Sequence, residues 1–232
     1  METLTKAAVV IGSSGGIGAA FVRQLQASGA YDEVIGLNRA NGFDLTDEAS
    51  IAQAAAVLKG RSLEPDMVIV ASGVLHRGDR GPEKSLRELD VGWMTENYKI
   101  NAIGPALVAK HFLPLMPRKQ RGVFAALSAR VGSISDNRLG GWHGYRASKA
   151  ALNMLIRNLS IEWQRKTPEA IITALHPGTV QTPLSEPFGG GHNAPDRFTP
   201  DDSASRMLQV LNSLSAEQSG RIFAYDGQEI MP

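Results

Sequence analysis

The chain contains no cysteine among its 232 residues. This absence excludes disulfide bonds, zinc sites built from thiolates and thiol nucleophiles, and it is typical of proteins from a reducing compartment. No apolar run approaches the roughly 20 residues that a membrane-spanning helix needs. The apolar segment at residues 7–11 stops at Gly12 and lacks the continuation of a signal peptide. We therefore expect a soluble, cytoplasmic protein.

The chain also lacks an excess of charge of either sign. It has 24 Lys and Arg against 23 Asp and Glu, a net charge of +1. This balance gives no reason to expect a nucleic acid or an anionic membrane as a partner. Hydrophobic residues make up 43% of the chain, enough for a sizeable core. Because no stretch has the composition of a linker, a repeat or a low-complexity segment, we expect a single domain over residues 1–232.

Short apolar runs rich in β-branched residues alternate with segments of helical periodicity. The strand-like runs lie at residues 6–11, 33–39, 66–71, 122–127, 170–175 and 221–225. Runs that are apolar on both faces are typical of a parallel sheet covered by helices. The alternation predicts an α/β fold with a single doubly wound parallel sheet of seven strands and helices on both faces. The segment at about 183–200 has little periodicity and many prolines and glycines, which predicts a substrate lid.

A glycine-rich turn follows the first strand directly. It reads Gly12-Ser13-Ser14-Gly15-Gly16-Ile17-Gly18, and the next helical pattern begins inside it. Glycines let the backbone approach a pyrophosphate, and a helix N-terminus supplies free N–H groups and a positive dipole. The spacing G-x-x-x-G-x-G is one residue wider at the front than G-x-G-x-x-G. We expect a dinucleotide on Gly12, Ser14, Gly16, Ile17 and Gly18; a tight turn without a ligand is the alternative.

The end of the second strand indicates which dinucleotide is bound. An acidic residue at this place binds the ribose 2′-hydroxyl, whereas an arginine accommodates a 2′-phosphate. The strand ends in Asn38-Arg39 without an acid. We therefore expect both residues to bind cofactor and favour NADP(H) over NAD(H), although Arg39 could instead be a solvated loop residue. Asp44 either contacts the adenine ring or orders its own turn.

Two further places on the chain suit a ligand or a proton relay. The third strand ends at Ala71-Ser72-Gly73, where small residues permit a close backbone approach. In the helical pattern of residues 93–116, Gly104-Pro105 predicts a kink or distorted turn right after Asn101. On such a turn the backbone carbonyl of Asn101 is free to accept a bond from water or a side chain. The alternative is that Asn101 is a tolerated polar residue.

Tyr145 and Lys149 stand four residues apart at the start of a helical segment that runs to about residue 163. On a helix they share one face. Leu152, Ile156, Leu159 and Trp163 continue the same stripe. An ammonium close to a phenol favours the phenolate, so we expect the pKa of Tyr145 to lie below its reference near ~10. The alternative is a half-buried core tyrosine beside a surface lysine.

In this order these features resemble the short-chain dehydrogenase/reductase superfamily, and the resemblance covers essentially the whole chain. The glycine turn, Ala71-Ser72-Gly73 in place of the usual N-A-G, Asn101, Tyr145 with Lys149, and Pro177-Gly178 with Thr182 carry it. The runs at residues 128–134 and 145–153 resemble the C-factor/sniffer-like carbonyl reductases in particular.

The resemblance implies a Rossmann fold and an oxidoreductase that transfers a hydride between NADP(H) and a carbonyl or secondary alcohol. It implies that Tyr145 is the general acid and base and that Lys149 assists it and holds the nicotinamide ribose. It further implies a relay water at Asn101 and cofactor contacts from Pro177, Gly178, Val180 and Thr182. A small-molecule substrate and a homodimer or homotetramer would be expected for such a protein.

The substrate-orienting serine is where the chain departs from the family. It usually stands three residues before the glycine that corresponds to Gly132, and Ala129 occupies that position here. Ser128 lies one residue earlier, and a shift of one residue on a strand sends a side chain to the opposite face. We take Ser128 as the first candidate, if the strand end re-aims it, and Ser133 as the second. If neither serves, the protein could bind the cofactor as a regulatory or signalling protein with little turnover.

Overall fold

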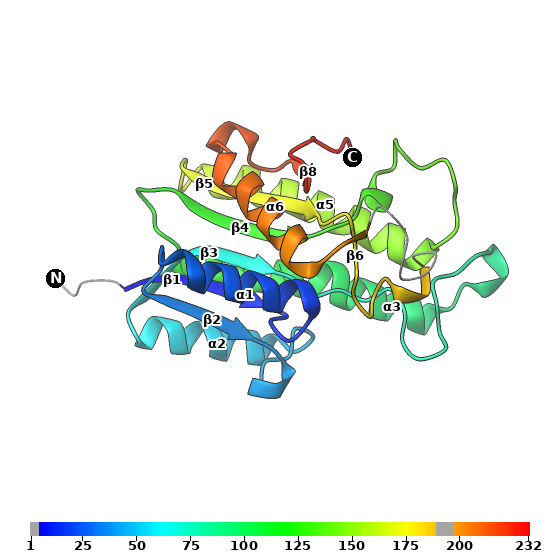
Figure 1. Cartoon of the computed structure of the whole chain (residues 1–232), viewed down its shortest axis with the longest axis horizontal. Helices are drawn as coiled ribbons and strands as arrows, with labels where there is room; N and C mark the ends of the chain where they lie inside the picture. The colour runs from blue at the N-terminus through cyan, green and yellow to red at the C-terminus, as the bar shows by residue number, and fades with distance from the viewer. Residues whose placement is uncertain (1–4, 189–196) are drawn as a thin grey trace.

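A computed structural model describes residues 5–188 and 197–232 (Figure 1). At its centre lies a parallel sheet of six strands in the order β2-β1-β3-β4-β5-β8. The strands are β1 Thr5–Ile11, β2 Glu33–Leu37, β3 Leu63–Val70, β4 Gly122–Leu127, β5 Ala170–His176 and β8 Ile222–Ala224. The chain winds from β1 outward to β2 and then returns to add β3 on the other side of β1, which confirms the doubly wound topology.

Helices cover both faces of this sheet. α1 Gly16–Ser28 and α6 Pro200–Ser213 pack on one face, in front of the strands in Figure 1. The other face carries α2 Glu48–Gly60, α4 Gly104–Phe112 and α5 His143–Gln164, with α3 Val91–Tyr98 beside α5. Within β1, Ala8 and Val10 face the first layer, whereas Val9 and Ile11 face the second. This strand is therefore buried on both sides, as its unbroken apolar sequence predicts.

The expected seventh strand is absent from the central sheet as described. β2 ends at Leu37, two residues before the predicted end, and Asn38 then caps a 3₁₀ turn at Arg39–Asn41. The Asn38 Oδ1 atom accepts a bond from Ala40 N at 2.9 Å, and Gly42 closes the turn in the left-handed region at φ 85°. This capped turn leads on to α2, and β2 lies at the edge of the sheet. The six strands of the sheet correspond to the six strand-like runs of the sequence.

The predicted lid at about 183–200 is only partly described, since residues 189–196 lie outside the described ranges. The described part before residue 189 contains a 3₁₀ turn at Glu186–Phe188. In the described part after residue 196, β7 Arg197–Phe198 pairs with β6 Thr179–Val180 in a separate two-stranded sheet. α6 begins at Pro200, so the last residue of the predicted lid is helical.

The helical segment before β4 is interrupted where the sequence predicts. Between α3 and α4 lies a π-helical turn at Lys99–Ile103, which contains Asn101. Pro105 has no N–H and stands four residues after Asn101, so the carbonyl of Asn101 cannot make the ordinary α-helical bond. Gly104 packs against Leu45, where a Cβ atom would lie 2.6 Å from Cγ. Among the described residues, no helix combines the length and apolar character needed to cross a membrane.

Candidate active site

The glycine turn joins β1 to α1 with its backbone folded tightly on itself. Gly12 adopts a left-handed conformation, φ 82°, and its N–H donates to the carbonyl of Leu37 at 2.8 Å. A Cβ atom on Gly18 would overlap the carbonyl oxygen of Gly12, and one on Gly12 would lie 2.5 Å from Ser72 Oγ. Side chains at either position would therefore disrupt the turn. α1 begins here with no side-chain cap, so its first N–H groups are available to a ligand.

A cavity of about 750 Å³ opens beside this turn, where β1 and β3 end. From β1 the chain adds β2 on one side and β3 on the other, so the direction in which strands are added reverses between β1 and β3. Doubly wound sheets bind their ligands at this point. Eight of the predicted cofactor-binding residues line the cavity, namely Gly12, Ser14, Asn38, Arg39, Asp44, Ala71, Ser72 and Gly73. Gly16, Ile17 and Gly18 do not line it; Gly18 packs beneath the turn instead.

Asp44 orders its own turn and also lines the cavity, and its contact with an adenine ring stays a prediction. It lines the cavity, and its Oδ1 atom also accepts bonds from the N–H and the hydroxyl of Thr46, both at 2.8 Å. These bonds hold the pKa of Asp44 below its ordinary value, with a smaller contribution from the charge of Arg39. Asp44 therefore orders its turn while it presents a carboxylate near Arg39.

Part of the cavity wall is formed by residues that belong to none of the sequence motifs. It comes from the loop after β3, from α3 and the π-helical turn that follows it, and from the segment after β6; the residues are His76, Arg77, Thr95, Glu96, Lys99, Ile100 and Leu184. His76 is partly buried, and its Nε2 atom lies 2.9 Å from the carbonyl oxygen of Pro183. Thr95 and Lys99 are four residues apart, so helical spacing was the one signal that could have grouped them.

Tyr145 and Lys149 occupy the first turns of α5, and both are buried, at 8% and 3% exposure. The Lys149 ammonium lies 5.8 Å from the centre of the Tyr145 ring and donates to the carbonyl of Leu127 at 2.7 Å. A Cβ atom on Gly73 would be 3.6 Å from Lys149 Nζ. Neither Tyr145 nor Lys149 lines the cavity itself, but the ammonium stands directly behind its Gly73 wall.

The electrostatics of this pair differ from the sequence-based expectation. Burial raises the pKa of Tyr145 to about 12 and lowers the pKa of Lys149 to about 7. The expected lowering of the phenol pKa is therefore wrong, because burial disfavours the charged form of both groups. At neutral pH the phenol keeps its proton, and the amine is close to its own titration point.

Asn101 connects the end of β3 to α5. Its side chain accepts a bond from Val74 N at 2.8 Å and donates to Val74 O at 2.9 Å and to Ser148 Oγ at 3.0 Å. The Ser148 hydroxyl in turn donates to the carbonyl of Tyr145 at 2.8 Å. The side chain of Asn101 is thus linked to the backbone of Tyr145 through the hydroxyl of Ser148. The water relay expected at its backbone carbonyl stays a prediction.

The two serine candidates point to different places. Ser128 is buried, and its hydroxyl donates to Asn153 Oδ1 on α5 at 2.7 Å. The buried hydroxyl of Ser133 accepts from Asp136 N at 3.1 Å, within its own loop. Ala129 lies between them in extended backbone and is partly exposed. The substrate-orienting role of either serine stays a prediction.

The segment from Pro177 to Thr182 lies next to the glycine turn without lining the cavity. A Cβ atom on Gly16 would lie 3.0 Å from Thr182 Cγ2, which places Thr182 against the first turn of α1. Gly178 is left-handed at φ 76° and packs on two aromatic rings, Val180 is buried, and the Pro177 carbonyl accepts from Ser203 Oγ at 2.7 Å. Their cofactor contacts stay a prediction.

Comparisons with known proteins agree with this geometry. The family model for short chain dehydrogenase matches residues 37–191, well over half of the chain. The C-signal protein of Myxococcus xanthus is 39% identical over 148 residues, which cover 63% of this chain and 82% of that protein. A 1-hydroxy-2-glutathionyl-2-methyl-3-butene dehydrogenase of Rhodococcus sp. strain AD45 is 29% identical over 232 residues, covering 94% of this chain and 96% of its own.

Solved structures show the same architecture. The NADPH-bound carbonyl reductase from chicken fatty liver superposes with a TM-score of 0.84 at 28% identity, over 99% of this chain and all of that one. The carbonyl reductase Sniffer of D. melanogaster gives a TM-score of 0.82 with the same coverage, and at 20% identity it supports the fold alone. The fold, the glycine turn and these relatives together place the chain in the short-chain dehydrogenase/reductase family of NAD(P)-dependent oxidoreductases.

Proposed function

We propose that the protein interconverts a carbonyl group and a secondary alcohol with NADP(H), using Tyr145 as general acid and base and Lys149 as its assistant. The observation that carries this proposal is the buried Tyr145–Lys149 pair, whose ammonium stands behind the Gly73 wall of the cavity. Small or medium ketones, aldehydes and quinones are the substrates we propose.

The residues of the cavity fit a nicotinamide dinucleotide. Gly12 and Gly73 line the cavity without a side chain, so a ligand there would meet their backbone, and the uncapped start of α1 offers N–H groups to a pyrophosphate. Arg39 on the wall suits a 2′-phosphate, which favours NADP(H). One of the similar structures is NADPH-bound. When bound, the nicotinamide supplies or accepts the hydride, while the protein supplies orientation and the proton.

The acid–base roles follow from the state of each group. A phenol with a pKa of about 12 keeps its proton through the neutral range and can donate it to a substrate oxygen during reduction. In alcohol oxidation the same group must first lose that proton, so this direction should gain from alkaline pH. Lys149, with a pKa of about 7, can pass a proton near neutral pH while its bond to the Leu127 carbonyl fixes it in place.

The experiment is NADPH oxidation with a panel of ketones, aldehydes and quinones. We expect Tyr145→Phe to lower kcat by about 10² to 10⁴-fold while the Kd for NADPH stays the same. Tyr31→Phe is the matched control, because Tyr31 also has a pKa raised to about 12 by burial but precedes β2 at the opposite end of the sheet. Equal turnover by the Tyr145→Phe variant and the wild type would refute the proposal.

A second function is favoured by one specific observation. Ala129 removes the hydroxyl that the family places beside the substrate, and one relative is named C-signal. A cofactor-binding regulatory or signalling protein with little turnover would have these features. A wild-type protein that binds NADPH but reduces no compound of the panel would support this second function instead.

A further inference from the structure

The helix that carries Tyr145 begins without a cap of its own. Trp142 is the N-cap residue of α5 and makes no side-chain capping bond, and the first turn contains no acidic residue. The first N–H groups of a helix have no partner within the helix, so they need one from elsewhere. The reactive phenol is three residues from this uncapped end.

Glu83, from the loop between β3 and α3, supplies what the helix lacks. Its Oε2 atom accepts a bond from Gly144 N at 3.0 Å, and its backbone carbonyl accepts a bond from Trp142 N. Gly141 and Trp142 are both left-handed, at φ 65° and 51°. Trp142 therefore holds a conformation that non-glycine residues rarely adopt, at the point where its N–H meets Glu83.

The fit between Glu83 and α5 is close and costs energy. Glu83 is 2% exposed, and a Cβ atom on Gly144 would lie 2.9 Å from its Oε1 atom. That oxygen is buried and has no hydrogen-bond partner among the described residues. Leaving a buried polar atom unpaired costs about 1–3 kcal/mol, and more for a charged group. Glu83 is kept at this cost against Gly144, the residue before Tyr145, which calls for a functional reason.

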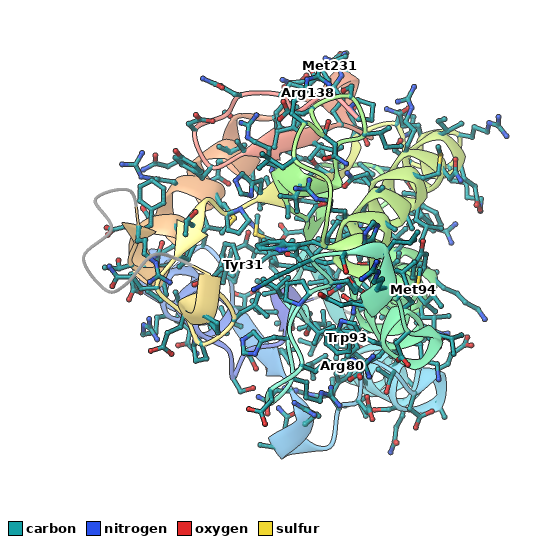
Figure 2. All side chains as sticks on the ribbon, turned by 90° about the vertical axis from the view of Figure 1, so that its right-hand side faces the viewer. Tyr31, Arg80, Trp93, Met94, Arg138 and Met231 are labelled. Carbon is teal, nitrogen blue, oxygen red and sulfur yellow. The ribbon has the colours of Figure 1, made fainter. Side chains whose placement is uncertain are left out.

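Tyr145 has a second anchor on the same loop. The Ser148 hydroxyl bonds to the Tyr145 carbonyl and accepts from Asn101, whose side chain is bonded to both backbone polar groups of Val74. Val74 and Glu83 thus hold the first turn of α5 from two sides. The loop itself is braced at Arg80, whose guanidinium is 2.7 Å from Asp90 and 5.7 Å from the centre of the Trp93 ring. Figure 2 labels Arg80 and Trp93, which lie next to each other.

We propose that Glu83 is a positioning residue for Tyr145, which holds the first turn of α5 so that the phenol stays aligned with its substrate. The proposal rests on the function proposed above. Without the Glu83 bond the first turn of α5 loses its cap, and the phenol is displaced while the glycine turn is untouched. A misplacement of about 1 Å can cost about 10²-fold in rate.

The test compares three changes at Glu83. Glu83→Ala removes the acceptor, and we expect kcat to fall about 10²-fold with the KM for NADPH unchanged. Glu83→Asp keeps the charge but is too short to reach Gly144 N, so it should also lose kcat. Glu83→Gln keeps the length and one acceptor oxygen, and should stay within about fivefold of wild type because only the charge assistance is lost. The order of the three kcat values therefore shows whether the length or the charge of the side chain at position 83 matters.

Glu88→Gln is the matched control. It lies in the same segment and is exposed, and its partners among the described residues are Lys84 N and Ser85 Oγ. It should leave kcat unchanged. If Glu83→Gln loses as much as Glu83→Ala, or if Glu83→Ala and Glu83→Asp both keep the wild-type kcat, the positioning role is wrong.

Two further readouts separate positioning from plain stability. In the Tyr145→Phe background, adding Glu83→Ala should not lower the residual rate again, because Glu83 acts through the phenol. Amide hydrogen exchange at Gly144, measured on the protein without cofactor, should accelerate in Glu83→Ala while the middle of α5 stays protected. An additive loss or unchanged exchange overturns the proposal. Full activity of Tyr145→Phe refutes the proposed function instead, so the two failures can be told apart.

Discussion

The Ser128 hydroxyl donates a hydrogen bond of 2.7 Å to Oδ1 of Asn153, one helical turn beyond Lys149. A hydroxyl has a single proton to donate, so in this arrangement the proton of Ser128 is directed to α5. Ala129, the next residue, stands in the position where the family has its substrate-orienting serine and offers only a methyl group. In the proposed mechanism the phenol of Tyr145 protonates the substrate oxygen, and position 129 supplies no second donor.

We expect Ala129→Ser to raise kcat for carbonyl reduction by about tenfold, since a hydroxyl at this position would donate to the developing oxyanion. The measurement is steady-state reduction of the best compound of the carbonyl panel. Ser128→Ala is the companion variant. A large loss of kcat in Ser128→Ala, with no gain in Ala129→Ser, would show that Ser128 already orients the substrate.

The second prediction concerns Arg39 and cofactor choice. Removal of one charged donor to a phosphate costs about 1.5–3 kcal/mol, so Arg39→Ala should lower kcat/KM for NADPH by about tenfold to about 100-fold. The value for NADH should change little, because NADH has no 2′-phosphate. Arg61→Ala is the control, since Arg61 pairs with Glu33 at 2.6 Å, at the start of β2 and far from Asn38. An equal loss with both cofactors would contradict a 2′-phosphate role.

The third prediction is a pH dependence of stability that comes from Lys149. Its pKa is about 7 in the folded protein against 10.5 as the ordinary value. Between these values the unfolded chain binds a proton that the folded chain does not, so stability rises with pH. The slope can reach about 1.4 kcal/mol per pH unit. The raised pKa of Tyr145 acts in the opposite direction, but only above its ordinary value of 10.0.

Urea unfolding of the wild type and of Lys149→Met, at about pH 7.5 and about pH 9.5, measures this contribution. Groups that titrate in both proteins cancel in the comparison. We expect the wild type to gain about 2 kcal/mol relative to Lys149→Met over this range. Parallel changes in the two proteins would mean that Lys149 is charged in the folded state, as it would be beside a compensating partner.

The parts of the site that the sequence predicts well are those in which neighbouring residues decide the structure. Gly12 is required by its left-handed φ and Gly18 by its contact with the Gly12 carbonyl in the same turn, and Pro105, which has no N–H, distorts the helix at Asn101. The predicted end of β2 was two residues too late because Asn38 could either continue the strand or cap a turn, and its bonds to Ala40 and Asn41 favour the turn.

The parts that the sequence does not predict depend on residues far apart in the chain. The pKa of Tyr145 is set by how deeply α5 is buried, and a spacing of four residues carries no information about that burial. Glu83 caps a helix that begins 60 residues later, so the usual search for a cap just before the helix finds only Trp142. His76 likewise meets Pro183 only in the folded protein.

The last prediction tests the glycine turn by comparing two alanine substitutions. A Cβ atom on Gly18 would overlap the Gly12 carbonyl oxygen, which is backbone and cannot turn away, whereas one on Gly60 would have no atom within 4 Å. Gly60 ends α2, where alanine is a better helix former by about 0.5–1 kcal/mol. We expect Gly60→Ala to be neutral or slightly stabilising.

Gly18→Ala should cost about 1–3 kcal/mol through overpacking, which for a chain of this length is a fall in Tm of about 2–4 °C per kcal/mol. It should also abolish NADPH binding, measured by quenching of protein fluorescence, because relief of the overlap must move the Gly12 backbone that lines the cavity. If Gly18→Ala lost stability yet bound NADPH as tightly as Gly60→Ala, the turn would be a packing element and the dinucleotide would have to lie elsewhere.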